Sequence, residues 1–567
     1  MMDHYELLRT MPGLPRLEIM TTQEHFKKTV EAADQLEVWD DELYLEFHRG
    51  CYTTQARTKK FHKKAEDLLI LLEMMQTILQ DTEEPSLDQL HSITTTKKSI
   101  DNLWQTLLKN EFHDILPGSS IPQVYEKAEQ ELGDVCLQTE NHLKNLLDEE
   151  ACHQRDYLSV FNPCEYERQT TFQLNTRDAW LLKGPNDETL IPYQTHDGHF
   201  LYHYTQPIRP FSTLVFYKEK IVQPIKEITD KTYTAETPFY KAHITEAGAL
   251  QIYDKASQRF LFKDTGNHLI MYEDVPMFWD AWDIACHHEA YGYPLSASTL
   301  NVIESNMIRK VIQATYIVEN TQIIQRYLFN RYDQTITVEN EIDWHHRRMM
   351  LKAEFNTNVL CRKASFDLGA GYIYRNTHKN TDMEKARFEV PGHRWVDLSE
   401  RDFGVAILND CKYGYSTDQS RIALTLLRSP INPMVFADEG KHSFTYAVSS
   451  HPGSDPFPTI ISARKMNREL LTFNGKTDKL ENFGLNFIAE SLQLMSLKRD
   501  EKERLVMRIC EVAGSRGTTQ IQLKGIDIKE VYRANVLEEV FEKKQILSNN
   551  SFELQYEPFK IYTFIIG

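Results

Sequence analysis

The chain has 567 residues, of which 41% are hydrophobic and 26% charged, and its formal net charge is −18. Such a length allows several hydrophobic cores, and the composition is that of a globular protein. The acidic balance argues against nucleic acid or an anionic membrane as a partner, because both require a basic surface, but it leaves a neutral ligand such as a sugar open.

The spacing of the cysteines and the N-terminal residues indicate the cellular compartment of the protein. Eight cysteines are scattered without CxxC spacing, which favours reduced thiols in a cytosolic protein over a disulfide framework. The chain starts Met-Met-Asp-His, with no basic region followed by an apolar core, so no signal peptide is expected. No apolar run approaches about 20 residues, so we expect no transmembrane helix and a cytoplasmic location.

Residues 1–40 combine a short helix, a Pro-Gly-Leu-Pro turn at 12–15 and an amphipathic segment from Glu24 to Leu36. This segment is too short to form a domain by itself. We expect it to be the end of a larger domain.

Residues 41–150 are expected to form a helical domain. The first helix has one apolar face over several turns: Phe61, Ala65, Leu68, Leu69, Leu72, Met75 and Leu79. We assign the lysines of its first turns to a solvated face: Lys59, Lys60, Lys63 and Lys64. A second helix ends at His113 and a third runs from about Ile121 towards Leu147, so the sequence predicts a three-helix bundle.

The character of the sequence changes near residue 155, where short β-rich runs separated by turn residues begin. The expected strands include residues 157–161, 169–174, 212–217, 269–272, 313–318, 335–339 and 422–427, with two closing strands in 552–566. Many short strands without intervening helices imply large antiparallel sandwiches. The predicted fold class is therefore α+β and multidomain, with a three-helix bundle before a small β-sandwich or linker region (151–235), a large β-sandwich (236–490) and a C-terminal β-sandwich (491–567).

One stretch combines a helix end with groups capable of chemistry. An apolar helical run leads into His113 and Asp114, and Pro117 and Gly118 then break the helix. A neutral imidazole is a common metal ligand, and an adjacent carboxylate can accept hydrogen bonds from a hydroxylated ligand. Spacing alone leaves a purely structural role open as well.

Residues 110–121 (Asn-Glu-Phe-His-Asp-Ile-Leu-Pro-Gly-Ser-Ser-Ile) resemble a hallmark of glycoside hydrolase family 38, the retaining α-mannosidases. The resemblance extends over the whole chain, and is strongest to the cytosolic or vacuolar branch and to bacterial relatives. Other stretches carrying it are residues 42–56, 279–283, 341–345, 386–391, 397–400, 408–415, 426–430 and 438–442.

The resemblance implies roles for the pair. His113 would be a ligand of the active-site zinc, or of another divalent metal, and Asp114 would contact the bound sugar. The family's other ligands include a His-x-Asp pair and the nucleophilic aspartate, which lie in an α/β domain upstream. No His-x-Asp occurs in this chain. We therefore expect the C-terminal part of an α-mannosidase, with no nucleophile or acid/base of its own and inactive alone, because one histidine supplies only part of a zinc ligand set.

A second candidate stretch is Trp-Asp-Ala-Trp-Asp at 279–283. Indole rings stack on sugar rings, and carboxylates accept hydrogen bonds from sugar hydroxyls. By resemblance the stretch lies on the edge of the β domain that faces the catalytic domain, which makes Asp280, Trp282 and Asp283 candidate substrate contacts. The structural alternative is a buried tryptophan pair with capped turns.

These observations lead to one functional hypothesis and one alternative. The hypothesis is that the chain is the helical and β-sandwich part of a metal-dependent retaining α-mannosidase that acts on mannosides. It implies a mannose-containing oligosaccharide as substrate, and it leaves open a separate N-terminal catalytic chain as a partner and a homo-oligomer. The alternative is a non-catalytic carbohydrate-binding or scaffolding β-sandwich protein derived from such an enzyme.

Overall fold

The computed structural model describes residues 2–567 except 41, 81–86, 152–153, 227–229, 488 and 548–549, and its described side chains also exclude residues 2 and 87–96. Contacts divide the chain into two units, Met1–Leu45 and Glu46–Gly567. The first unit contains α1 (Met2–Thr10), α2 (Thr22–Glu31) and the 3-10 turn η1 (Ala33–Gln35). A capping box between Thr21 and Glu24 begins α2, since each side chain accepts from the other residue's backbone N–H.

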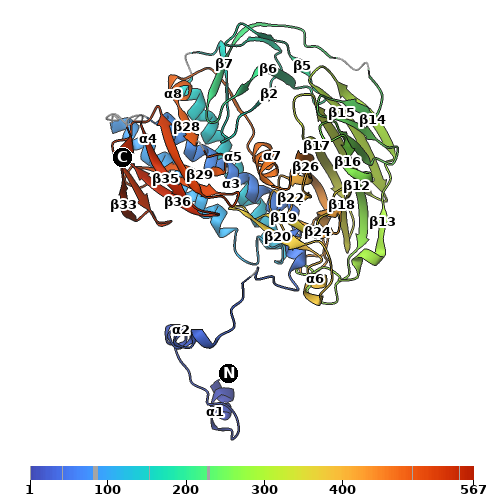
Figure 1. The fold of residues 1–567 in the computed structure, drawn as a ribbon, viewed down its shortest axis with the longest axis vertical. Coiled ribbons are helices and arrows are strands. Elements are labelled where there is room, and N and C mark those ends of the chain that lie inside the picture. The colour runs from blue at the N-terminus through green and yellow to red at the C-terminus, as the bar shows by residue number, and fades with distance from the viewer. Residues whose placement is uncertain are drawn as a thin grey trace. The chain divides into compact units, whose positions relative to one another are not determined.

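The second unit begins with the 3-10 turn η2 (Arg49–Tyr52) and three long helices, α3 (Ala56–Leu79), α4 (Leu87–Lys109) and α5 (Pro122–Glu150), which confirms the predicted bundle. The predicted apolar face of α3 is buried at Ala65, Leu69 and Leu72. The helices share one core with the C-terminal strands, including Leu494, Leu497, Met507, Ile509 and Phe564. In Figure 1 the blue helices accordingly lie beside the red strands.

The helix α4 ends four residues earlier than the sequence predicted, at Lys109 rather than His113. The side chain of Asn110 donates to the carbonyl oxygen of Thr106 at 2.9 Å, so it competes for an acceptor that a continuing helix would use. Residues 110–117 then form successive turns. The prediction of the helix was right in type, and its boundary was wrong because the helix tightens at this point: the N–H of Asn110 donates to the Leu107 carbonyl oxygen at 3.0 Å, closer than to that of Thr106 at 3.4 Å.

Two small sheets follow the helices and enclose their own core around Val160, Phe172, Tyr202 and Phe216. The first has the order β27 (Leu471–Asn474), β1 (Tyr157–Phe161), β7 (Thr213–Ile221), β3 (Trp180–Lys183), β4 (Thr189–Leu190). The second has the order β2 (Arg168–Leu174), β6 (Phe200–Ile208), β5 (Tyr193–Gln194). Because β27 comes from beyond the large sandwich, the chain returns to this region before its last domain.

A ten-stranded and a nine-stranded sheet form the large sandwich. The first has the order β21 (Val390–Pro391), β24 (Gly414–Asp418), β25 (Arg421–Arg428), β18 (Met349–Thr357), β12 (Phe262–Glu273), β10 (Leu250–Asp254), β9 (Tyr240–Ile244), β8 (Thr234–Glu236), with β11 (Arg259–Phe260) on β10 and β13 (Gly292–Pro294) on β12. The second has the order β14 (Thr299–Ser305), β15 (Arg309–Val318), β16 (Thr321–Asn330), β17 (Ile336–Trp344), β26 (Gly440–Pro452), β23 (Phe403–Asn409), β22 (Trp395–Ser399), β19 (Lys363–Asp367), β20 (Tyr372–Asn376).

Buried hydrogen bonds join these two sheets. Asn267 on β12 donates to the hydroxyl oxygen of Tyr327 at 2.6 Å, and the Tyr446 hydroxyl donates to Asn267 at 2.5 Å. The amide of Asn267 also donates to the side-chain oxygen of Gln325 at 3.0 Å. All four side chains are buried, so each polar group finds its partner across the core.

The last domain is a smaller sandwich of two sheets. One has the order β28 (Gly484–Phe487), β31 (Gly517–Lys524), β35 (Ser551–Tyr556), β34 (Ile546–Leu547), and the other β29 (Leu492–Arg499), β30 (Leu505–Glu511), β36 (Ile561–Ile566), β32 (Val531–Ala534), β33 (Val540–Lys544). The remaining short helices are η3 (His288–Tyr291), α6 (Asp382–Ala386), α7 (Phe457–Asn467) and α8 (Asp478–Asn482). The predicted α+β fold class, with a helical bundle before antiparallel sandwiches, is confirmed. Among the described residues, no helix is both long and apolar enough to cross a membrane.

Candidate functional site

The turn after α4 presents the predicted pair to solvent. The His113 side chain is 79% exposed and that of Asp114 48% exposed, and 3.7 Å separates Nε2 of His113 from the nearer Asp114 oxygen. The ring of Phe112 lies 4.2 Å from the imidazole, centroid to centroid. An imidazole and a carboxylate therefore stand together at the surface, where both can reach a ligand.

The backbone of this turn is held from behind by Tyr125 on α5. Its hydroxyl oxygen accepts from the N–H of Ser120 at 2.8 Å, and the hydroxyl donates to the carbonyl oxygen of Asp114 at 3.1 Å. Burial raises the pKa of Tyr125, so the hydroxyl keeps its proton at neutral pH. Gly118 lies at φ +96°, and a Cβ there would fall 2.4 Å from the carbonyl oxygen of Thr54. Glycine is thus required by both conformation and close approach.

The prediction that Lys59 lies on a solvated face of the helix is wrong. Lys59 is only 6% exposed, and its Nζ donates to the carbonyl oxygens of Thr54 and, at 2.8 Å, Leu116. The prediction used the helical repeat, which identifies the core face of a helix but not the loops that cover its ends. Lys64, by contrast, is exposed as predicted and pairs with Glu140.

Residues 46–55, here called the lead-in segment, connect α3 to the second candidate stretch. The guanidinium of Arg49 donates to Asp283 at 3.1 Å, and the N–H of Gly50 donates to the carbonyl oxygen of Trp282 at 2.8 Å. The carboxylate of Asp438 accepts from the N–H groups of Gln55 and Ala56 at 2.7 and 2.8 Å, which satisfies the N-terminus of α3. These bonds bring the turn at 279–283 to the same region as the His113 turn.

The structure gives the carboxylates of the second stretch internal partners. Besides the ion pair of Asp283 with Arg49, Asp280 accepts from the N–H groups of Ile431 and Asn432 at 2.6 and 3.1 Å. Both aspartates are buried and Trp282 is half-buried. The substrate contacts predicted for Asp280, Trp282 and Asp283 stay predictions, and the bonds seen here already explain the two carboxylates.

The tryptophans of this stretch do not form the buried pair that the structural alternative described. Trp279 is 62% exposed, at φ +59°, with its ring 5.9 Å from that of Trp282 in an edge-on arrangement. An exposed indole beside the candidate site can stack on a ligand or pack against another domain.

Sequence reasoning gave no role to Arg428, the residue that ties these segments together. It is fully buried and pairs with Asp274 at 2.6 Å. Its other N–H groups donate to the Thr54 hydroxyl at 3.0 Å and to three backbone carbonyl oxygens of the 279–283 turn: those of Asp280, Ala281 and Asp283. The sequence signal was an arginine at the end of an otherwise apolar strand, since a buried guanidinium needs several acceptors.

The described residues do not complete a metal site around His113. Within the ranges whose side chains are described, no group of three or more His, Cys, Asp and Glu side chains could hold a metal ion. His113 and Asp114 offer one nitrogen and one carboxylate, whereas a zinc site takes three or four protein ligands. Any metal that the pair helps to bind needs further ligands, and we derive no chemical step through a metal from these residues.

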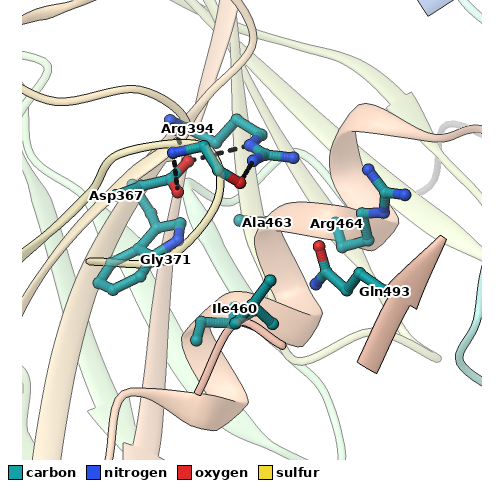
Figure 2. A pocket seen from close by; sticks show the side chains of 10 residues that line it. Asp367, Gly371, Arg394, Ile460, Ala463, Arg464 and Gln493 are labelled. Carbon is teal, nitrogen blue, oxygen red and sulfur yellow. Dashed lines mark hydrogen bonds and ion pairs between the residues drawn. The ribbon is translucent and has the colours of Figure 1, made fainter. Parts of the chain in front are cut away.

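A cavity of about 590 Å³ lies behind the turn, between α3, the large sandwich and the C-terminal sandwich. Its wall includes Lys59, Glu111, Leu116 and Pro117. It shares Arg394, Arg464 and Gln493 with a much smaller cavity of about 10 Å³, shown in Figure 2, where Arg394 turns toward its partner Asp367. The smaller space has room for about one water molecule. The inner side of the His113 turn therefore borders open space as well as packed side chains.

Three family models match successive parts of the chain. They are the alpha mannosidase middle domain at residues 46–149, the glycosyl hydrolases family 38 C-terminal domain at 235–436, and the glycosyl hydrolases family 38 C-terminal beta sandwich domain at 491–564.

Curated relatives agree with these models. Human alpha-mannosidase 2C1 is 28% identical over an alignment that covers 100% of this chain and 54% of the relative. Alpha-mannosidase G of Dictyostelium discoideum is 28% identical, with 100% of this chain and 56% of the relative covered. The yeast alpha-mannosidase is 28% identical over 87% of this chain and 44% of its own length. The chain thus spans about half the length of these relatives.

Solved structures share the fold. The crystal structure of an alpha-mannosidase from Enterococcus faecalis V583 superposes with a TM-score of 0.73 at 14% identity, covering 96% of this chain and 72% of that one. A family 38 glycosyl hydrolase structure from the same species gives 0.72 at 15% identity, with 98% and 74% covered.

Proposed function

The chain belongs to glycoside hydrolase family 38, and from this we propose that it forms the middle and β domains of a retaining, metal-dependent α-mannosidase that hydrolyses terminal α-mannosides. The observation that supports this most directly is the exposed pair of His113 and Asp114. A buried framework of Tyr125, Lys59 and Gly118 holds their turn, so the pair is presented in a defined position. Defined positions are what a binding site needs.

We assign separate tasks to the two side chains. The neutral imidazole of His113 offers a nitrogen lone pair to a divalent metal, zinc by preference, that is completed by ligands outside residues 1–567. The Asp114 carboxylate accepts a hydroxyl hydrogen of the sugar, and the nearby Ser119 hydroxyl, 3.5 Å away, helps to orient it. A metal bound there would supply charge stabilisation and orientation of the sugar hydroxyls.

The reacting carboxyl groups are placed elsewhere in this proposal. A retaining glycosidase needs a nucleophile and an acid/base about 5–5.5 Å apart. The relatives are about twice as long as this chain, which supports an α/β domain that carries both groups, on the same polypeptide or on a separate chain. In the assembled enzyme, the chain described here would contribute His113, Asp114 and a wall of the substrate cavity.

This function is tested first by the activity of the chain alone. The purified chain is expected to leave an aryl α-mannoside uncleaved with or without added zinc, because the proposal places the two reacting carboxyl groups outside residues 1–567. Mixing it with the α/β domain of a family 38 enzyme should restore metal-dependent cleavage, with each part alone as the control. Zinc-dependent turnover by the chain alone, abolished by His113→Ala, would overturn the proposal. An inactive mixture in which the chain binds mannosides would favour the non-catalytic alternative.

Apolar side chains near the turn support a docking surface for the proposed α/β domain. They lie on the His113 turn, on the lead-in segment and on segments that hydrogen bonds join to the lead-in segment: Phe47, Phe112, Val275, Met277, Phe278, Trp279, Val435 and Phe436, all exposed. A monomer rarely leaves a large apolar patch uncovered.

We expect the isolated chain to bind an apolar fluorescent dye or to self-associate at micromolar concentration through this surface. Changing Met277 and Phe278 to serine should remove most of the signal, and the α/β domain should compete with it. The same change at the exposed Val540 and Phe541 of the C-terminal sandwich is the matched control and should change it little. A monodisperse monomer that binds no dye would contradict this expectation.

We also propose a cytoplasmic location. In the part of the chain that the structure describes, seven cysteines are free, which suits a reducing compartment. A homo-oligomer is compatible with the same exposed apolar surface.

A further inference from the structure

The ammonium of Lys59 bridges two segments that meet behind the candidate pair. Its Nζ donates to the carbonyl oxygen of Leu116, two residues after Asp114, and to that of Thr54 in the lead-in segment. Gly118 approaches the same Thr54 carbonyl closely. Lys59 thus links the His113 turn to the start of α3, and one turn further along that helix His62 pairs with Glu111 of the same turn at 2.9 Å.

The position is unfavourable for a cation in other respects. Lys59 is buried in the first turns of α3, where the positive end of the helix dipole repels it. Among the described residues, none of the ion pairs involves Lys59; the nearby charges are Asp438, which attracts it, and Lys412, which repels it. Burial lowers the pKa of Lys59 to about 8. Burying this cation is therefore unfavourable, and the hydrogen bonds to the two carbonyl oxygens offset part of the penalty.

The hydrogen-bond partners of Lys59 indicate why a lysine is buried at this position. The turn at 110–118 has its own bonds, from the N–H of Ile115 to the Phe112 carbonyl oxygen at 2.8 Å and from the N–H of Gly118 to the Ile115 carbonyl oxygen at 3.1 Å. These bonds set the shape of the turn, but they do not attach it to the lead-in segment. Tyr125 attaches the turn to α5, the pair of His62 and Glu111 attaches its first residues to α3, and Lys59 attaches its end to the lead-in segment.

We propose that Lys59 is a positioning residue for His113 and Asp114, because its N–H donors tie the backbone after Asp114 to the lead-in segment and so fix the direction in which the pair projects. The roles of the pair rest on the proposed function. The tether itself is a property of this chain, and its test requires no mannosidase activity.

The cavity behind the turn makes a chemical rescue possible. Lys59 lines this space of about 590 Å³, so shortening its side chain to alanine leaves room for a small amine beside the two carbonyl groups. A primary alkylammonium ion such as n-butylammonium carries the same N–H donors as the lost side chain. Tetramethylammonium carries the charge without any N–H donor, so it separates hydrogen bonding from charge.

The experiment is amide hydrogen exchange of the full chain, read on peptides covering residues 110–120. Lys59→Ala and Lys59→Met should lower protection of this turn about tenfold or more, because a charged donor to two carbonyl groups is lost. The helices and sandwiches should keep theirs. n-Butylammonium should restore protection in Lys59→Ala but not in Lys59→Met, whose side chain still fills the space. Lys64→Ala, a solvated lysine on the same helix, is the matched control and should behave as the unmodified chain.

Three results would overturn the proposal. One is unchanged protection of the turn in both Lys59 variants. Another is rescue by tetramethylammonium equal to that by n-butylammonium, which would make charge alone responsible. The third is loss of protection throughout the helices and sandwiches in both variants, which would make Lys59 a general core residue. None of these outcomes bears on mannoside cleavage, so failure here is distinct from failure of the proposed function.

Discussion

Replacing His113 by alanine is expected to reduce α-mannoside hydrolysis by the assembled enzyme about a hundredfold or more. Loss of residues that merely orient metal ligands costs about 10–100-fold in metal affinity or activity, and loss of a ligand should cost at least as much. Both the metal content and the turnover should fall, because the variant removes the only metal-binding nitrogen at the turn. The measurement is kcat/KM for an aryl α-mannoside together with the metal bound per assembled enzyme.

The neighbouring carboxylate should give a different pattern. Asp114→Asn is expected to lower kcat/KM about tenfold, since a hydrogen bond to a charged acceptor contributes about 1.5–3 kcal/mol and the amide keeps part of it. Metal content should change less than in His113→Ala. A matched control is His199→Ala, because His199 and Asp197 form a half-exposed pair 3.9 Å apart in a different domain. If both turn variants behave like this control, the roles given to His113 and Asp114 are wrong.

The helices and strands could be predicted because the sequence patterns that specify them are local. Tyr157–Phe161 and the strands at 552–566 alternate or run apolar between turn residues, and the structure has strands there. Pro122 begins α5, where its missing N–H costs nothing. These signals involve neighbours within a few residues, so no knowledge of the tertiary fold is needed.

The candidate site was predictable only in part, because its framework depends on distant partners. The His-Asp pair was visible as a motif, and its exposure follows from the broken helix. The covering of Lys59 comes from Leu116, 57 positions away, and Asp280 finds its backbone partners 151 and 152 positions away. Helical periodicity and residue type carry no information on such contacts. The tertiary structure was therefore needed to show that some charged residues predicted to lie on the surface are buried hydrogen-bond donors.

The buried Arg428 should be the position at which a single substitution destabilises the candidate site most. Arg428→Met keeps most of the apolar stem but leaves the Asp274 carboxylate, itself buried, without its cation. Removing one partner of a buried pair costs about 3–5 kcal/mol, because the other charge stays desolvated. The carbonyl groups of the 279–283 turn also lose their donor, so this turn and the lead-in segment should loosen together.

Thermal unfolding with local hydrogen exchange can resolve this effect. We expect the transition of the large sandwich to fall by about 10 °C in Arg428→Met, and peptides at 46–56 and 277–285 to lose protection first. Adding Asp274→Asn should recover part of the loss, since it removes the uncompensated charge, whereas independent residues would give additive losses. Lys543→Met breaks an exposed pair with Glu530, 3.1 Å apart, and should leave the transition nearly unchanged, because solvent screens such a pair. Equal effects of the Arg428 and Lys543 variants would mean that the buried arginine does not hold these segments together.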